Sequence, residues 1–199
     1  MTRTIVYSTA LVAFASVVVM TLASIVLPNW VSYGVTSVKG RSVTRNVGLH
    51  RSCSSVLDPP CREFPLDRED CAGDGSAFCS MWRTTGFLVS LAAVLELVTL
   101  VAFVVVMAGG KQKRVAGWRI LAGLLSVVAL LLAAAVSVVA YLYDNDDKFF
   151  VPGWHLDKSW ILATVSAGLS VLCAAGLVTS AFVLPQERGY EFLNDPDTA

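Results

Sequence analysis

The chain has 199 residues, of which 55% are hydrophobic and only 15% are charged. A soluble domain of this length would carry nearer a quarter of charged residues, so the composition argues against an ordinary soluble fold. The 15 basic and 15 acidic residues give a formal net charge of zero. This balance offers no basic surface for a nucleic-acid partner, and none is predicted.

Apolar residues are concentrated in four stretches, at residues 5–27, 86–108, 120–143 and 160–184, which contain a single charged residue, Glu96. About 20 apolar residues suffice for a helix to cross the hydrocarbon core. Their unbroken hydrophobicity excludes the alternation of a barrel strand. We predict an all-α membrane protein, with four transmembrane helices in one domain covering residues 1–199. The first stretch could instead end in a signal-peptide cleavage site, but its length and its single preceding basic residue, Arg3, favour a retained helix.

The connections between these stretches differ in charge. Residues 109–119 carry four basic residues and no acid, whereas residues 144–159 are mainly acidic. The positive-inside rule therefore places residues 109–119, the tail 185–199 and both termini in the cytosol. Residues 28–85 and 144–159 are then expected outside, and the plasma membrane is the expected location.

Cysteine usage supports the same orientation. Cys53, Cys61, Cys71 and Cys79 lie in the long connection 28–85, and Cys173 lies in the fourth apolar stretch. Four cysteines outside the cytosol suggest two disulfides, which a small domain without a large core needs. Three pairings are possible. We favour Cys53 with Cys61 and Cys71 with Cys79, because each closes a short loop, while crossed or nested pairings remain open. Zinc is the rival interpretation, but the close CxxC spacing of a zinc site is absent.

Two segments of the long connection have the pattern of β-strands. Residues 31–35 alternate large apolar with small residues, and residues 42–50 contain a second such run.

The long connection also carries a family pattern. A tryptophan follows the first helix, then come a Gly-Leu pair, two spaced cysteines and an arginine before the second helix: Trp30, Gly48, Leu49, Cys53, Cys61 and Arg83. This pattern resembles the claudin and peripheral-myelin-protein superfamily, although His50 stands where the family has an aromatic residue. The additional pair Cys71 and Cys79 looks more like the claudin-like membrane proteins of fungi, including the PalI and eisosome-associated groups. Tetraspanins carry their large loop between the third and fourth helices, so their order differs.

The resemblance implies a four-helix bundle topped by a small antiparallel sheet in the first outside connection. It implies that Trp30 and the Gly-Leu pair pack between sheet and helices, and that Cys53–Cys61 joins adjacent strands. It also implies lateral assembly in the membrane rather than catalysis.

Glu96 is a functional candidate, because an acid inside a membrane helix is costly. It could be a protonated carboxyl that bonds to Thr99 on its own helix, or across the bundle to one of four serines: Ser126, Ser137, Ser166 and Ser170. A contact between subunits and an ion or proton pathway are the alternatives.

Residues for catalysis are not evident. Phosphate-binding glycine loops, zinc-protease motifs and nucleophile elbows are absent from the sequence. We therefore expect no enzyme, cofactor, metal or small-molecule substrate. A membrane thiol–quinone oxidoreductase is the enzyme alternative, but it would need a reactive CxxC pair. In the tail, Tyr190 and Leu193 have the spacing of a clathrin-adaptor sorting signal.

These observations predict a non-enzymatic membrane protein that organises membrane or cell-surface structure. It would do so in the lipid bilayer by homo-oligomerisation or by binding other membrane proteins. The alternative is an auxiliary subunit of a channel, transporter or receptor.

Overall fold

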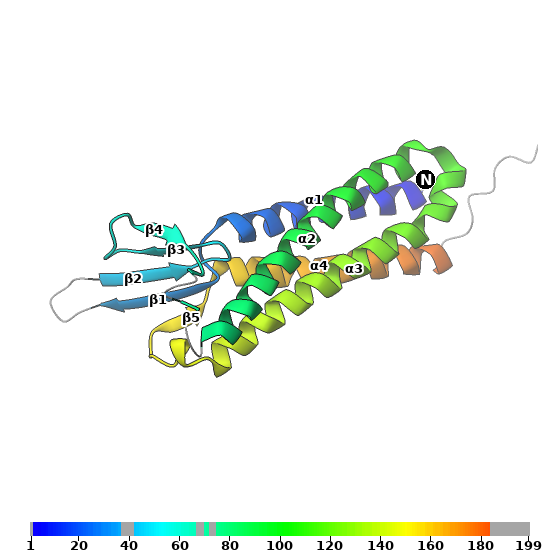
Figure 1. The fold of residues 1–199 in the computed structure, drawn as a ribbon. Helices are drawn as coiled ribbons and strands as arrows, with labels where there is room; N and C mark the ends of the chain where they lie inside the picture. The colour runs from blue at the N-terminus through cyan, green and yellow to red at the C-terminus, as the bar shows by residue number, and fades with distance from the viewer. Residues whose placement is uncertain (1, 37–41, 67–69, 72–74, 184–199) are drawn as a thin grey trace, which may run out of the picture.

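The computed structural model describes residues 2–36, 42–66, 70–71 and 75–183 (Figure 1). Four long helices run side by side: α1 (Thr2–Val26), α2 (Gly75–Ala108), α3 (Gly110–Asn145) and α4 (Lys158–Val183). All four are long and apolar enough to cross a membrane. The predicted four-helix membrane fold is therefore confirmed, with a small sheet at one end of the bundle.

The second and third helices are longer than predicted. α2 has 34 residues and begins at Gly75 rather than at residue 86, and α3 has 36 residues and begins at Gly110 rather than at residue 120. The predicted loop 109–119 is therefore mostly helix, and only Gly109 separates α2 from α3. Hydropathy marks only the apolar part of a helix, whereas Lys, Gln and Arg, which follow Gly110 in the sequence, are polar residues that are good helix formers.

The sheet has five antiparallel strands in the order β4-β3-β2-β1-β5. They are β1 (Val31–Thr36), β2 (Ser42–Val47), β3 (Arg51–Ser54), β4 (Cys61–Glu63) and β5 (Trp154–Leu156). The first two strands confirm the predicted ones. The prediction that the sheet forms from the first connection alone was incomplete, because β5 comes from the connection between α3 and α4. Its pairing with β1 spans most of the chain, so no local pattern could reveal it.

β1 is the strand that joins the two connections. It pairs with β2 from Val31↔Val47 to Thr36↔Ser42, and on its other edge with β5, where Val31 lies opposite Leu156. Val31 and Val47 are buried at the end of the sheet nearest the helices. The sheet is thus anchored where it meets the bundle, while its β1–β2 hairpin extends away from the helices (Figure 1).

A hydrophobic core fills the junction between sheet and bundle. It contains buried aromatic side chains from both parts: Trp30, Phe64, Phe78, Trp82 and Phe149. The rings of Phe64, Phe78, Trp82 and Phe149 contact one another, with Phe64 edge-on to Trp82 at 5.5 Å, Phe78 stacked on Trp82 at 5.5 Å and Phe149 tilted against Phe78 at 6.0 Å. Such pairs stabilise beyond their buried area, so the two parts of the molecule form one structural unit.

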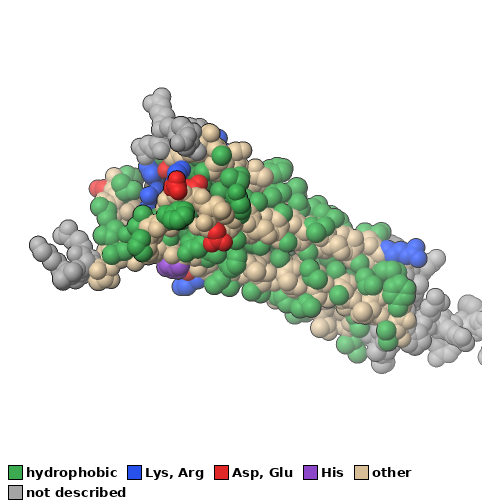
Figure 2. Space-filling model, turned by 90° about the horizontal axis from the view of Figure 1, so that it is seen from below, with side chains coloured by type: hydrophobic (Ala, Val, Ile, Leu, Met, Phe, Trp, Pro, Cys, Tyr) green, Lys and Arg blue, Asp and Glu red, His purple; other side chains and the backbone are tan. Residues whose placement is uncertain are grey.

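Charged side chains lie near the two ends of the molecule, and hydrophobic side chains cover the helical shaft between them (Figure 2). Large apolar side chains exposed on all four helices, such as Val12, Val101, Leu130 and Leu172, agree with a lipid-facing surface.

Candidate functional site

The sequence motif around Trp30 lies at the centre of the junction. The indole Nε1 of Trp30 donates to the Ser24 carbonyl at 2.7 Å, and the backbone N–H of Trp30 donates to the Val47 carbonyl at 2.9 Å. Trp30 therefore links the end of α1 to the sheet. Leu49 is buried beside it in the same core. The expectation that this motif packs between sheet and helices is confirmed.

Gly48 is required by a close approach of two backbone segments. A Cβ atom built on Gly48 would lie 2.6 Å from the Cα of Pro28, a distance no side chain can tolerate. The Gly48 carbonyl also accepts a hydrogen bond from the Trp82 indole at 3.2 Å. The glycine thus lets the chain after β2 pass against the segment after α1 and reach α2.

The first disulfide joins Cys53 to Cys61. The two residues lie directly opposite each other in β3 and β4, as the resemblance implied. Cys61 is exposed, so this disulfide closes the outer hairpin of the sheet rather than fastening the sheet to the helices.

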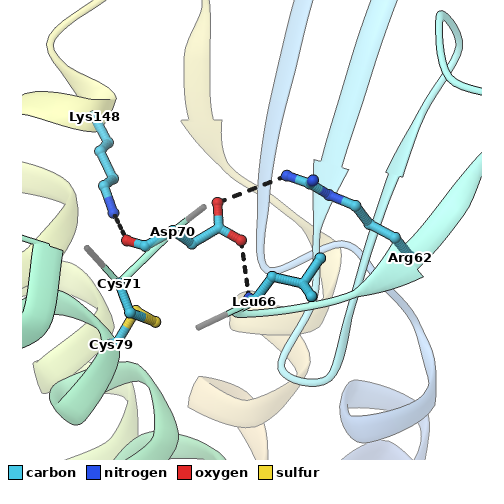
Figure 3. Close-up of a disulfide and its surroundings, with 6 residues drawn as sticks. All are labelled: Arg62, Leu66, Asp70, Cys71, Cys79 and Lys148. Carbon is cyan, nitrogen blue, oxygen red and sulfur yellow. Dashed lines mark hydrogen bonds and ion pairs between the residues drawn. A yellow bond between two sulfur atoms is a disulfide. The ribbon is translucent and has the colours of Figure 1, made fainter. Parts of the chain in front are cut away.

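The second disulfide joins Cys71, in the connection before α2, to Cys79 in the first turns of α2 (Figure 3). The adjacent Asp70 is held by four contacts, one of which is the hydrogen bond from its N–H to the Leu66 carbonyl at 2.9 Å. Its carboxylate accepts from the Leu66 N–H at 3.0 Å and pairs with Arg62 at 3.7 Å, and its carbonyl accepts from the Lys148 ammonium at 2.6 Å. Both disulfide pairings match the ones the sequence favoured.

Lys148 gives this cluster a link to the third connection. Its ammonium also lies 4.2 Å from the centroid of the Phe78 ring, where a cation–π attraction adds to the hydrogen bond. One lysine thus joins η1 (Asp147–Phe149), α2 and the Cys71 segment. Sequence reasoning missed Asp70 and Lys148, because neither belongs to a motif and they lie 78 positions apart.

Asp157 forms a second polar link, immediately before α4. Its carboxylate accepts from Ser32 Oγ at 2.6 Å, from Asn29 Nδ2 at 3.2 Å and from the Lys158 N–H at 2.7 Å. Partial burial raises the pKa of Asp157, but these three hydrogen bonds and the nearby His155 outweigh it and leave the pKa below its usual value. The ionised carboxylate therefore fixes β1 to the start of α4. No motif in the sequence indicates this role.

Glu96 is fully buried within the bundle, and Thr21 on α1 donates its hydroxyl to Oε1 at 2.8 Å. The expected partners were wrong. Thr99, Ser126, Ser166 and Ser170 donate instead to backbone carbonyls, and Ser137 is exposed. Thr99, Ser126 and Ser170 bond to carbonyls one turn back on their own helices, as serine and threonine in helices readily do, and Ser166 bonds to the Val17 carbonyl of α1, so these hydroxyls are already occupied. Among the described residues, Oε2 of Glu96 has no hydrogen-bond partner.

We expect the Glu96–Thr21 pair to contribute modestly to stability. In a double-mutant cycle of Glu96→Leu and Thr21→Val, the coupling free energy should be about 0.6 kcal/mol and below about 1.7 kcal/mol, as for other hydrogen bonds between membrane helices. Glu96→Gln keeps an acceptor for Thr21 and should be mild. Unfolding in mixed detergent micelles measures the free energy of unfolding of each variant.

Thr99→Val is the matched control for this cycle, because the Thr99 hydroxyl donates to Leu95 on its own helix. Its coupling to Glu96 should be near zero. Equal coupling of Glu96 to both threonines would contradict the structural role. A Glu96→Gln protein that folds normally and loses a pH-dependent flux would instead support the transport alternative.

The remaining predicted residues fall in different places. Arg83 lies on the exposed face of α2 close to the sheet. Cys173 is a buried free thiol, as predicted. Tyr190 and Leu193 lie outside the described residues. Within the part of the chain that the structure describes, no three metal-binding side chains come together.

Among the described residues, several large apolar side chains are exposed on the connections at the sheet end, outside the four spans. Besides Leu27, which directly follows α1, they are Val35, Val56, Leu57, Phe150 and Val151, with Phe150 71% exposed and Val56 70% exposed. Sequence reasoning did not single them out, because only the fold shows which apolar residues of the connections stay out of the core.

Comparisons with known proteins add no relative: no family model and no curated protein matches this chain. The geometry therefore defines the class, an all-α membrane-type bundle with a disulfide-stapled sheet built from both connections at one end.

Proposed function

We propose that this protein is a non-enzymatic organiser of membrane or cell-surface structure, which self-associates or binds other membrane proteins laterally through its sheet. The observation that carries the proposal is the exposure of Val35, Val56, Leu57, Phe150 and Val151 beyond the membrane-spanning helices. Apolar surface that stays exposed outside the membrane-spanning helices is a feature of protein–protein contact sites.

The way the sheet is fastened supports a role in recognition. Side-chain hydrogen bonds tie it to the helices at four points: Trp30 to Ser24 of α1, Trp82 of α2 to Gly48, Tyr143 of α3 to the Trp154 carbonyl, and Ser32 to Asp157 before α4. The Cys71–Cys79 disulfide adds a link between the connection and α2, and Cys53–Cys61 closes the outer hairpin of the sheet. A surface held in one conformation loses little entropy on binding, which favours affinity for a partner.

We further propose that the sheet faces the outside of the plasma membrane and both termini face the cytosol. The basic residues of the sequence between Gly109 and Arg119 support this, because they fall at the end of the bundle opposite the sheet. Disulfides at the sheet end agree with an oxidising compartment. Membership of the claudin superfamily is part of the same proposal, supported by the position of Trp30, Gly48 and the Cys53–Cys61 hairpin.

The test is to measure assembly after replacing the exposed side chains. Crosslinking in intact cells and the mass of the detergent-solubilised complex should reveal homo-oligomers of the parent chain. Phe150→Ser and Leu57→Ser should each weaken assembly by about tenfold, because a well-placed apolar contact at an interface contributes about 1–2 kcal/mol.

Val183→Ser is the matched control, because Val183 is equally exposed but lies at the end of α4 farthest from the sheet. It should leave assembly unchanged. A defined complex with a channel, transporter or receptor would favour the auxiliary-subunit alternative. A monomer that is diffuse in the membrane and crosslinks to nothing would overturn both.

A further inference from the structure

A pocket of about 590 Å³ lies where the β3–β4 hairpin meets the side of α2. Basic and apolar side chains both line it, the basic ones being His50, Arg51 and Arg83 and the apolar ones including Leu49, Phe64 and Phe87. Its volume falls within the range of sites that hold small organic ligands. The mixed lining is typical of a site for a molecule with a charged part and an apolar part.

A second pocket of about 260 Å³ adjoins the same short segment from the side of α1. It shares Leu49, His50 and Arg51 with the first pocket, and its apolar lining includes Ile25 and Val26 at the end of α1. His50 and Arg51 therefore line both pockets. The larger pocket is bordered by apolar residues of α2 and the smaller one by apolar residues of α1.

The position of these pockets along the helices places them at the membrane boundary. Arg83 is the last charged residue of α2 before Glu96, and Phe87, one turn further along, is 65% exposed. In a bilayer, the basic residues would lie at the level of the headgroups and Phe87 and Val26 would lie in the hydrocarbon. The pockets thus extend across the boundary on the sheet side.

From this geometry we propose that the two pockets bind one anionic phospholipid, with its headgroup phosphate at His50, Arg51 and Arg83 and its two chains along α1 and α2. The guanidinium group forms paired, charge-assisted hydrogen bonds with phosphate oxygens. Two arginines and one carboxylate line the pocket, with Glu63 opposite Arg51 in the β3–β4 register, and this balance of charges favours an anionic headgroup over a zwitterionic one.

Gly86 keeps the helix side of the larger pocket open. A Cβ atom at this position would lie 3.7 Å from Nε2 of His50, in ordinary contact, so a small side chain fits. A larger one, as in Gly86→Leu, would extend into the pocket without removing any charge. The Gly86→Leu variant therefore distinguishes binding of a lipid in a shaped pocket, which it should weaken, from attraction of a lipid to a basic surface, which it should leave unchanged.

The test uses the full chain in nanodiscs of phosphatidylcholine with a minor share of phosphatidylglycerol. Native mass spectrometry then counts the phosphatidylglycerol molecules retained on each chain. Arg51→Gln should lower the apparent affinity by about tenfold, because it removes charge-assisted hydrogen bonds to the phosphate. Gly86→Leu should also lower it. Arg51 is exposed on the sheet, so its replacement leaves the core intact and carries the test even if Gly86→Leu fails to fold.

Arg45→Gln is the matched control, because it removes the same charge from the same sheet but Arg45 lines neither pocket. It should retain the parent affinity. Equal losses for Arg51→Gln and Arg45→Gln would overturn the proposal, as would equal retention of phosphatidylcholine and phosphatidylglycerol. Displacement of the lipid by inorganic phosphate at matched concentration would also overturn it, because the site would then take free phosphate rather than a lipid.

Discussion

Replacing Trp30 with alanine should lower the free energy of unfolding by about 3–5 kcal/mol, the usual cost of removing a large aromatic side chain from a core. The side chain is 0% exposed and packs where α1, α2 and the sheet meet. Its loss also leaves the buried Ser24 carbonyl without the hydrogen bond that the indole supplies. Because one residue serves both the packing and the link, a single substitution should weaken the whole junction. Unfolding in mixed detergent micelles, followed by helical circular dichroism, measures the change.

Trp30→Phe separates the two contributions. It retains most of the buried ring and removes the N–H donor, so its own effect should be about 1–3 kcal/mol, the usual cost of leaving a buried carbonyl unpaired. This is smaller than the effect of the alanine variant, which also creates a cavity. Trp118→Ala is the control at the far end of the bundle, where Trp118 is only half-buried against Phe182. An effect of Trp30→Ala no larger than that of Trp118→Ala would contradict the central role of the junction.

Removing the second disulfide, with Cys71→Ser and Cys79→Ser together, should cost about 2–3 kcal/mol. In the chain-entropy model the stabilisation depends on the length of the closed loop, and the two cysteines are separated by 8 positions. The same variant should also weaken the contact of Lys148 with the Asp70 carbonyl, because the disulfide holds the Asp70 segment against α2. The measured loss should therefore lie at the upper end of this range.

The Cys53→Ser and Cys61→Ser pair is the matched comparison, because its loop has the same separation of 8 positions. Its removal should cost less in total, since no further contact between connections depends on it. Under mild native reduction, the exposed Cys53–Cys61 bridge should open first, because Cys79 is buried and a thiolate must reach the sulfur that it attacks. Peptide mapping after graded reduction reads the order, and earlier opening of Cys71–Cys79 would contradict the structure.

Local contacts are the part of this structure that the sequence predicted well. The Cys53–Cys61 and Cys71–Cys79 pairings join residues close in the chain, so loop closure alone favoured them. The first two strands were visible from their alternation of apolar with small or polar residues, whereas their burial increases toward the end of the sheet nearest the helices. The start of α2 was missed, since residues 75–85 bury Phe78 and Trp82 against the sheet rather than in lipid, and hydropathy does not register that environment.

The four spans are what the sequence by itself determined, because a bilayer selects each helix by its own run of apolar side chains, independently of its neighbours. Only the tertiary structure decided the partners across the bundle: Thr21 for Glu96, Asp70 for Lys148, and Ser32 for Asp157, at separations of 75, 78 and 125 positions. The same holds for β5, for the pockets around Arg51 and for the exposed Phe150. Each of these features depends on how helices and strands that are distant in the chain pack together. The sequence contains several side chains of similar polarity that could have formed the same hydrogen bonds, so it does not select among them.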